Sequence, residues 1–169
     1  MNTACAITLN CWVFLGEVGG LGPKLGPLLV QLPPSLRFDF PVAHNFFSTL
    51  REYSRGEVVC EPRHMAWYGA DAQQFLQDFQ VARVAADPSL LPQAAEPGGW
   101  DRLVYYRLHG SPRIYYSKYP KEYLDVIIHK LRTAAERAAV WCIFDNTAEG
   151  AATGNALDVL QRTSTNSNR

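Results

Sequence analysis

Short, continuously apolar runs alternate along the chain with longer stretches in which apolar residues recur every three or four positions. A continuous apolar run of a few residues is typical of a strand that is buried on both faces. The first 27 residues are harder to interpret, because several glycines and prolines follow a short apolar stretch around Trp12. The runs that predict buried strands lie at 28–32, 58–61, 81–86, 103–110 and 140–144.

Four amphipathic stretches predict helices that pack against such strands. The stretch at 120–139 is the clearest, because Leu124, Ile127 and Leu131 recur at helical spacing and Pro120 stands at its first turn. The other predicted helices lie at 39–55, after an expected N-cap at Asp71, and at 148–162.

Strands and helices therefore alternate, which is the pattern of a parallel sheet covered by helices. A complete barrel of eight β/α units needs about 250 residues, so five units need about 156, and the chain has 169. We expect an α/β fold that is a partial TIM-barrel-like arrangement, with about five parallel strands alternating with helices. An open doubly wound sheet is the alternative. Residues 1–163 would form one domain, and the polar residues 164–169 a disordered tail.

Each predicted strand passes into its loop through a polar or charged residue. The carboxyl ends of parallel strands meet at one edge of a sheet, where α/β proteins bind their ligands. We therefore expect a shared polar pocket at this edge. Its predicted members are Gln31, Glu61 with Arg63, Asp87, Arg107 with His109, and Asp145 with Asn146.

The run that ends at Gly110 carries the most specific signal. Side chains alternate between the faces of a strand, so Tyr105, Arg107 and His109 should share one face. A guanidinium and an imidazole at the end of a buried strand need partners or a ligand. By the same alternation, Glu61 and Arg63 should point to the same side.

Structural explanations compete with a functional one at each of these positions. Glu61 with an arginine could form a buried ion pair kept for structure, and His109 could be a core histidine bonded to a carbonyl. Asp87, before a proline, could only cap a turn, and Asn146 could only start the last helix. The tyrosines at 115, 116 and 119 could form an aromatic wall over the pocket or pack a loop against helix 120–139. The other three histidines are expected in loops or on the surface.

Acid–base chemistry is the reaction class that this set of residues can support. The predicted catalytic residues are Glu61, Asp87, Arg107 and His109, with a carboxylate as base, the imidazole as proton shuttle and the guanidinium fixing an anionic group. The predicted ligand-binding residues are Gln31, Arg63, Trp67, Asp145 and Asn146. A non-catalytic module that binds phosphate or nucleic acid is the alternative.

Several classes of site lack their motifs in this sequence. There is no GxSxG elbow, no GxxxxGK[ST] phosphate loop and no GxGxxG after a strand. Cysteine pairs and paired histidines with zinc spacing are also missing, so no metal is predicted, although scattered carboxylates could still hold a divalent ion. The cofactor stays unknown.

Charge and cysteine content indicate which partners and which cellular compartment to expect. Sixteen basic residues balance sixteen acidic ones, so no global field attracts nucleic acid or an anionic membrane. The four cysteines are far apart in the sequence, and no apolar run has the length of a membrane span. We expect a soluble, cytoplasmic protein whose ligand is small and polar or anionic.

The order of these motifs resembles the YecE-like family, also called domain of unknown function 72. The resemblance covers residues from about 14 to 160. It implies a TIM-barrel-like fold with the motifs at the strand carboxyl ends, and it implies no reaction. The motifs that carry it are LGPLLVQLPP at 25–34, EPRH at 61–64 with Trp67, Ala86-Asp87, YRLHG at 106–110, and Asn146-Thr147 with Ala151 and Asn155-Ala156.

The sequence departs from the family pattern in two places. Asp145 stands where members usually have an asparagine, so a carboxylate replaces an amide near the pocket. The three earlier β/α units of the family have no counterpart here, which would leave strands 28–32 and 140–144 as bare edges. We therefore expect a truncated or inactive fragment, or a chain whose edges are covered by self-association or by a partner chain.

Overall fold

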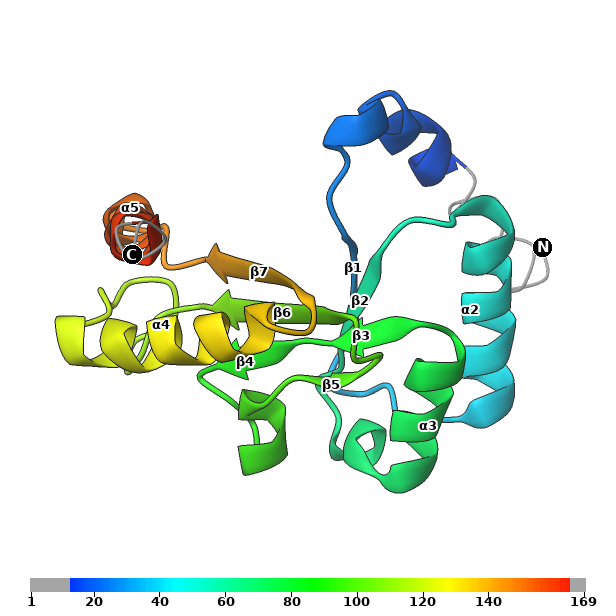
Figure 1. Cartoon of the computed structure of the whole chain (residues 1–169). Helices are drawn as coiled ribbons and strands as arrows, with labels where there is room; N and C mark the ends of the chain where they lie inside the picture. The colour runs from blue at the N-terminus through cyan, green and yellow to red at the C-terminus, as the bar shows by residue number, and fades with distance from the viewer. Residues whose placement is uncertain (1–12, 165–169) are drawn as a thin grey trace.

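The computed structural model describes residues 13–164, and it is an α/β fold in which parallel strands alternate with helices (Figure 1). Residues 13–19 are helical and lead through the short helix η1 (Gly22–Lys24) to the first strand. The strands are β1 (Leu28–Gln31), β2 (Val58–Glu61), β3 (Val81–Arg83), β4 (Ala85–Asp87), β5 (Gly98–Gly99), β6 (Leu103–Leu108) and β7 (Ala139–Phe144). The helices that follow them are α2 (Phe40–Tyr53), α3 (Ala70–Asp78), α4 (Lys121–Ala135) and α5 (Ala151–Ser164), with short turns η2 (Met65–Tyr68) and η3 (Pro92–Ala95).

The strands form two sheets in the order β1-β2-β3-β5 and β4-β6-β7. Every pairing is parallel except that of β5 with β3. The predicted strand at 81–86 is therefore divided: β3 pairs with β2, and β4 pairs with β6. Val84 lies between them and donates its N–H to the Cys60 carbonyl at 2.9 Å. The two sheets thus continue one another as an arc of a barrel.

Strand β5 is absent from the sequence prediction. It consists of two glycines, so it has no apolar side chain to indicate a strand. Gly99 has a φ of +67°, and a Cβ there would overlap the Val81 carbonyl oxygen. Only glycine can therefore pair at this point, which explains a strand without the usual sequence signal.

The helix boundaries differ from the predicted ones by a few residues. Asp39 caps α2 by accepting the Val42 N–H at 3.0 Å, so this helix begins where its cap indicates. Asp71 was expected to cap α3, but the helix begins one residue before it and Gly69 is the N-cap. Asp71 lies instead in the first turn, where a carboxylate still favours the helix dipole.

The core has three parts: one between the strands and helices on each flank of the molecule, and one on the inner face of the strands. The helices α2 and α3 cover β1–β3, and α4 and α5 cover β4, β6 and β7 (Figure 1). Val104, Tyr106 and Leu108 pack against α4, whereas Leu103 and Tyr105 pack on the inner face with Val59, Ala82 and Val84. The predicted alternation along β6 is confirmed, and it sends Arg107 to the inner side.

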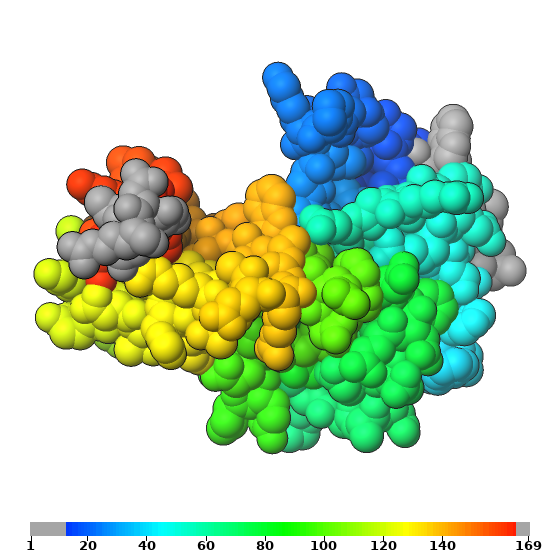
Figure 2. Space-filling model, in the orientation of Figure 1, coloured from blue at the N-terminus to red at the C-terminus, as the bar shows by residue number. Residues whose placement is uncertain are grey.

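The space-filling view shows an open notch between the blue segment that leads into β1 and the orange and red segments of β7 and α5 (Figure 2). Trp141 of β7 lies against Gly26, just before β1. Within the described residues, β1 pairs only with β2, and β7 only with β6. No helix in this part of the chain is both long and apolar enough to cross a membrane.

Candidate functional site

Arg107 is the centre of an ionic cluster at the carboxyl ends of four strands. Its Nη1 donates to Glu61 Oε2 at 2.6 Å and to the Gln31 side-chain oxygen, and its Nη2 donates to Asp145 Oδ2 at 2.9 Å. The parallel register explains the meeting, because Gln31 and Glu61 are direct partners at the ends of β1 and β2. One guanidinium therefore joins β6 to β1, β2 and β7.

His109 lies beside this guanidinium, two residues further along the chain. Its Nδ1 is 3.0 Å from Asp145 Oδ2, and its Nε2 is 3.6 Å from Glu61 Oε1. Since Asp145 is ion-paired with Arg107, its carboxylate accepts the bond, and we place the proton of the neutral ring on Nδ1. The distance of Nε2 exceeds that of a direct hydrogen bond, so this nitrogen keeps a free lone pair. The residue is 95% buried, and its ring and that of Tyr115 form a T-shaped pair.

Glu61 accepts hydrogen bonds on both carboxylate oxygens. Arg63 donates from Nε and Nη2 to Oε1, each at 3.2 Å, while Arg107 holds Oε2. Burial raises the pKa of Glu61, but the interactions with His109 and Arg107 lower it more, to about 2. Glu61 is therefore ionised at neutral pH and is a weak base, although it can stabilise a neighbouring positive charge.

Asp87 and Asn146 lie in a second polar cluster, and no contact joins their side chains to Arg107 among the described residues. Asp87 Oδ2 accepts the Tyr119 hydroxyl at 2.7 Å, and this hydroxyl accepts the Gly110 N–H at 2.8 Å. Asn146 donates to the Ser117 carbonyl at 2.9 Å and to Asn155 Oδ1 at 3.0 Å. The expected single pocket is thus divided between two clusters.

Asn155 completes this second cluster from helix α5. Its side chain accepts the Tyr119 N–H at 3.1 Å and donates to the Tyr119 carbonyl at 3.0 Å. Tyr119 and Asn155 are each 1% exposed, and Asn146 is fully buried. The cluster fixes the loop between β6 and α4, because nearly all of its polar groups are satisfied within the chain.

Trp67 was expected to contact the ligand, but the structure places it in the core. It is 2% exposed, packs edge-on against Phe38, and donates its indole N–H to the Leu36 carbonyl at 3.1 Å. An indole after a strand end can serve either purpose, and the sequence could not distinguish them because Leu36 and Phe38 belong to another loop.

A cavity of about 220 Å³ lies beside the ionic cluster, at the carboxyl ends of β2 and β4. Glu61, Arg63 and His109 form its polar corner. Its other walls are mostly apolar and include Leu90 and Ile114, which the sequence analysis did not single out. Tyr115 lines the cavity as an aromatic wall would, whereas Tyr119 is buried against Tyr123 of α4.

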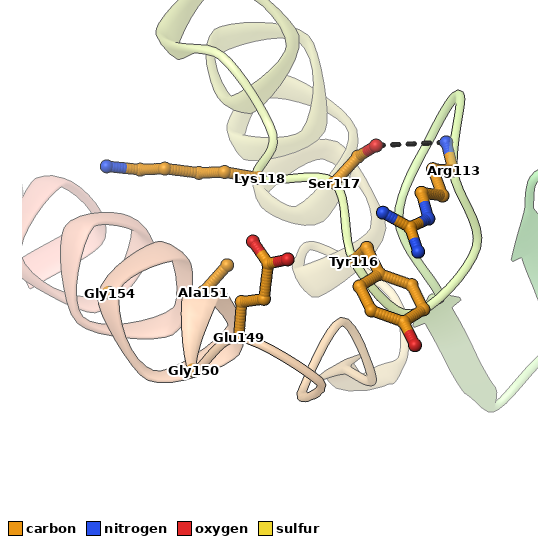
Figure 3. Close-up of a pocket in the computed structure, with 8 residues that line it drawn as sticks. All are labelled: Arg113, Tyr116, Ser117, Lys118, Glu149, Gly150, Ala151 and Gly154. Carbon is orange, nitrogen blue, oxygen red and sulfur yellow. Dashed lines mark hydrogen bonds between the residues drawn. The ribbon is translucent and has the colours of Figure 1, made fainter.

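A second hollow opens at the start of α5 (Figure 3). It has about 560 Å³ and is lined by Arg113, Lys118 and Glu149, among others. The Arg113 guanidinium lies over the Tyr116 ring at 3.6 Å. None of its lining residues belongs to the ionic cluster, so we treat it as separate from the candidate site.

No three His, Cys, Asp or Glu side chains within residues 13–164 are arranged to hold a metal ion. The guanidinium of Arg107 lies between the carboxylates of Glu61 and Asp145, where its positive charge would oppose a cation. The chemistry available at this corner is therefore that of an oriented imidazole among paired charges.

Comparison with known proteins identifies the fold but assigns no activity. The family model described as "Protein of unknown function DUF72" matches residues 7–169. A DUF72 family protein from Thermotoga maritima MSB8 superposes with a TM-score of 0.77 at 22% identity, over 93% of this chain and 65% of that one. A DUF72 family protein from Enterococcus faecalis V583 gives 0.75 at 21% identity, over 91% and 68%. This chain thus spans about two thirds of these structures, and no protein among those curated for function matches it.

Proposed function

The chain belongs to the DUF72 family of unknown function, and since this membership assigns no reaction, we propose one from the geometry. The ionic cluster is a proton-transfer site for a small polar or anionic substrate, and His109 is its catalytic residue. The observation that carries the proposal is the pair of His109 contacts. Nδ1 is held by Asp145 at 3.0 Å, and Nε2 belongs to a ring that lines the cavity.

The proton moves between the substrate and His109 Nε2. The lone pair of Nε2 takes a proton from a substrate in the cavity, and the imidazolium returns it to the product. Asp145 holds the ring in the tautomer that leaves Nε2 free, and Glu61 faces the same nitrogen at 3.6 Å and stabilises the imidazolium. Arg107 positions both carboxylates. Asp87 acts through the backbone, since its carbonyl accepts the His109 N–H at 2.7 Å.

Deuterium exchange tests this proposal. In D₂O the wild-type chain should catalyse exchange at the acidic carbon of a small 2-oxo acid such as 2-oxobutanoate, followed by ¹H NMR. His109→Gln should lower the rate by about 100-fold. His129→Gln, on the exposed face of α4, should leave it unchanged. Equal rates of deuterium exchange in the wild type and His109→Gln would show that His109 is not the catalytic residue.

A Glu61→Gln variant separates an enzyme from a binding module. Loss of exchange with anion binding intact supports proton transfer, because the imidazolium loses its charged neighbour. Unchanged or tighter binding of anions by a chain that never exchanges deuterium supports the non-catalytic module.

We also propose that a second copy of this chain covers the strand edges beside the notch. Within residues 13–164, β1 and β7 each pair on one side only, and Trp141 on β7 is 39% exposed. Unpaired edges next to exposed apolar side chains favour association, and a twofold arrangement in which β1 of each copy faces β7 of the other would cover both edges in a closed dimer.

Light scattering of the purified chain tests the dimer. We expect a mass of twice 18.9 kDa, reduced to one chain by Trp141→Lys, which adds a charge beside the exposed edge of β7. A monomeric wild-type chain with a cooperative thermal transition would contradict the proposal.

A further inference from the structure

The cavity beside His109 offers a ligand few polar partners. Glu61 Oε1 is already bonded by Arg63 and Oε2 by Arg107, so the carboxylate has little capacity left for a ligand. Arg63 uses Nε and Nη2 on Glu61, and its Nη1 has no hydrogen-bond partner among residues 13–164. Tyr68 also lines the cavity, and its hydroxyl already donates to the Pro62 carbonyl at 2.9 Å. Among the described residues that line the cavity, the side-chain nitrogens without a partner are therefore Arg63 Nη1 and His109 Nε2, and of these the charged guanidinium is the donor that favours an anion.

The balance of charge at this corner favours one negative charge over two. The cluster contains two guanidiniums, of Arg63 and Arg107, and two carboxylates, of Glu61 and Asp145. With a neutral His109 these charges cancel, and a protonated His109 leaves one positive charge. With the neutral His109 that the proposed function requires, a bound monoanion leaves one uncompensated negative charge in this partly enclosed site and a doubly charged phosphate leaves two, so the site favours the monoanion.

Size and wall chemistry restrict the rest of the ligand. The volume of about 220 Å³ corresponds to about seven water molecules in the liquid, and it is below the range of typical drug-sized sites. Three prolines, Leu90 and Ile114 form apolar walls, and the last two are 65% and 47% exposed at the rim. An apolar ligand body would cover them.

We propose, resting on the function proposed above, that the cavity binds a small monocarboxylate with an apolar body. The carboxylate lies against Arg63 Nη1, and the apolar part lies against Leu90 and Ile114. The substrate class is thus a short-chain organic acid, neither a nucleotide nor a free phosphate.

Binding of matched small molecules to the full chain tests the proposal, with ¹H–¹⁵N spectra as the readout. The probes are 3-methylbutanoate, its neutral amide of the same shape, 3-methylbutylamine and inorganic phosphate. We expect 3-methylbutanoate to bind at least about tenfold more tightly than the amide or phosphate, with no binding of the amine. Shifts should appear at His109, Leu90 and Ile114.

Two variants assign the effect to the cavity. Arg63→Gln should weaken the binding of 3-methylbutanoate by about tenfold and leave the binding of its amide unchanged. Arg102 has a side chain that is 74% exposed, and Arg102→Gln should change the binding of neither compound. An unchanged circular dichroism spectrum of each variant excludes misfolding. Equal affinities for carboxylate and amide, tighter binding of phosphate, no binding by any probe, or an unaffected Arg63→Gln would each overturn the proposal.

These outcomes are distinct from failure of the proposed function. Phosphate that binds in preference, with deuterium exchange still dependent on His109, would overturn the ligand class alone. If the carboxylate binds as expected but the rate of deuterium exchange is the same in His109→Gln, the proposed proton transfer alone would be overturned.

Discussion

Two polar clusters lie at the carboxyl ends of the strands, and they differ in whether a polar atom remains free to bond a ligand. The cluster of Tyr119, Asn146, Asn155 and Asp87 is mostly buried and bonded within the chain, and its one buried oxygen without a hydrogen bond to the described residues is Asn146 Oδ1. The cluster around Arg107 is charged and borders a cavity, and His109 Nε2 has no partner within hydrogen-bond distance in the described chain. The comparison shows that polar residues at strand ends indicate a site where an unbonded polar atom belongs to a residue that lines a cavity, as in His109.

The largest expected effect is on stability, in the cluster of Tyr119 and Asn155. Asn155→Ala removes three hydrogen bonds and leaves the buried partner groups on Tyr119 and Asn146 unsatisfied. We expect a loss of about 4 kcal/mol in the free energy of unfolding, measured with urea. Asn45→Ala, on the exposed side of α2, should change it by less than about 0.5 kcal/mol. Similar losses in both variants would show that the cluster has no special structural role.

The next effect concerns acid stability and the Arg107 cluster. The folded-state pKa of Glu61 is lowered from 4.5 to about 2, so its ionised form stabilises the fold above about pH 4.5. This contribution is lost as the pH falls from about 4.5 to about 2, which amounts to about 3 kcal/mol.

Urea unfolding at pH 5 and at pH 2.5 measures this loss. Glu61→Gln should have a flatter acid limb than the wild type, because the amide does not titrate. Glu52→Gln, on the exposed side of α2, serves as the matched control. Parallel pH profiles for the wild type and Glu61→Gln would contradict the assignment of the acid limb to Glu61.

A smaller effect tests the boundary between the clusters. Tyr119→Phe removes the hydroxyl that bonds Gly110 and Asp87, and we expect a loss of about 1.5 kcal/mol. Binding of 3-methylbutanoate should stay within about twofold of the wild type, since this hydroxyl does not line the cavity. Tyr53→Phe, at an exposed tyrosine, should alter neither quantity. A stronger effect on binding than on stability would join the two clusters into one site.

The sequence could predict the parts of the fold that depend on local periodicity. The strand β2 and the helix α2 were predicted within two residues, because an apolar run and an N-cap mark them. Alternation along β6 correctly placed Arg107 and His109 on one side. The convergence of Glu61, Arg107 and Asp145 followed from a parallel sheet, in which all carboxyl ends meet.

The rest depends on contacts between residues that are distant in the sequence. Asn155 bonds Tyr119 across 36 positions. The family resemblance includes this asparagine among its motifs, but the helical pattern of α5 does not indicate its partner. Asp87 looked like a member of the pocket because its partner Tyr119 lies in another loop. The glycine strand β5 and the division at Val84 have no apolar signal, so only the pairing in the sheet reveals them.

The protonation state of His109 tests the central claim most directly. Long-range ¹H–¹⁵N NMR distinguishes the two tautomers of a neutral histidine, and His64 is an internal reference. Its Nδ1 accepts the Ala66 N–H at 3.1 Å, which requires the proton on Nε2. We predict the opposite tautomer for His109, with the proton on Nδ1 and the lone pair on Nε2, and the loss of its signals in His109→Gln assigns them. A His109 with its proton on Nε2, as in His64, would contradict the account.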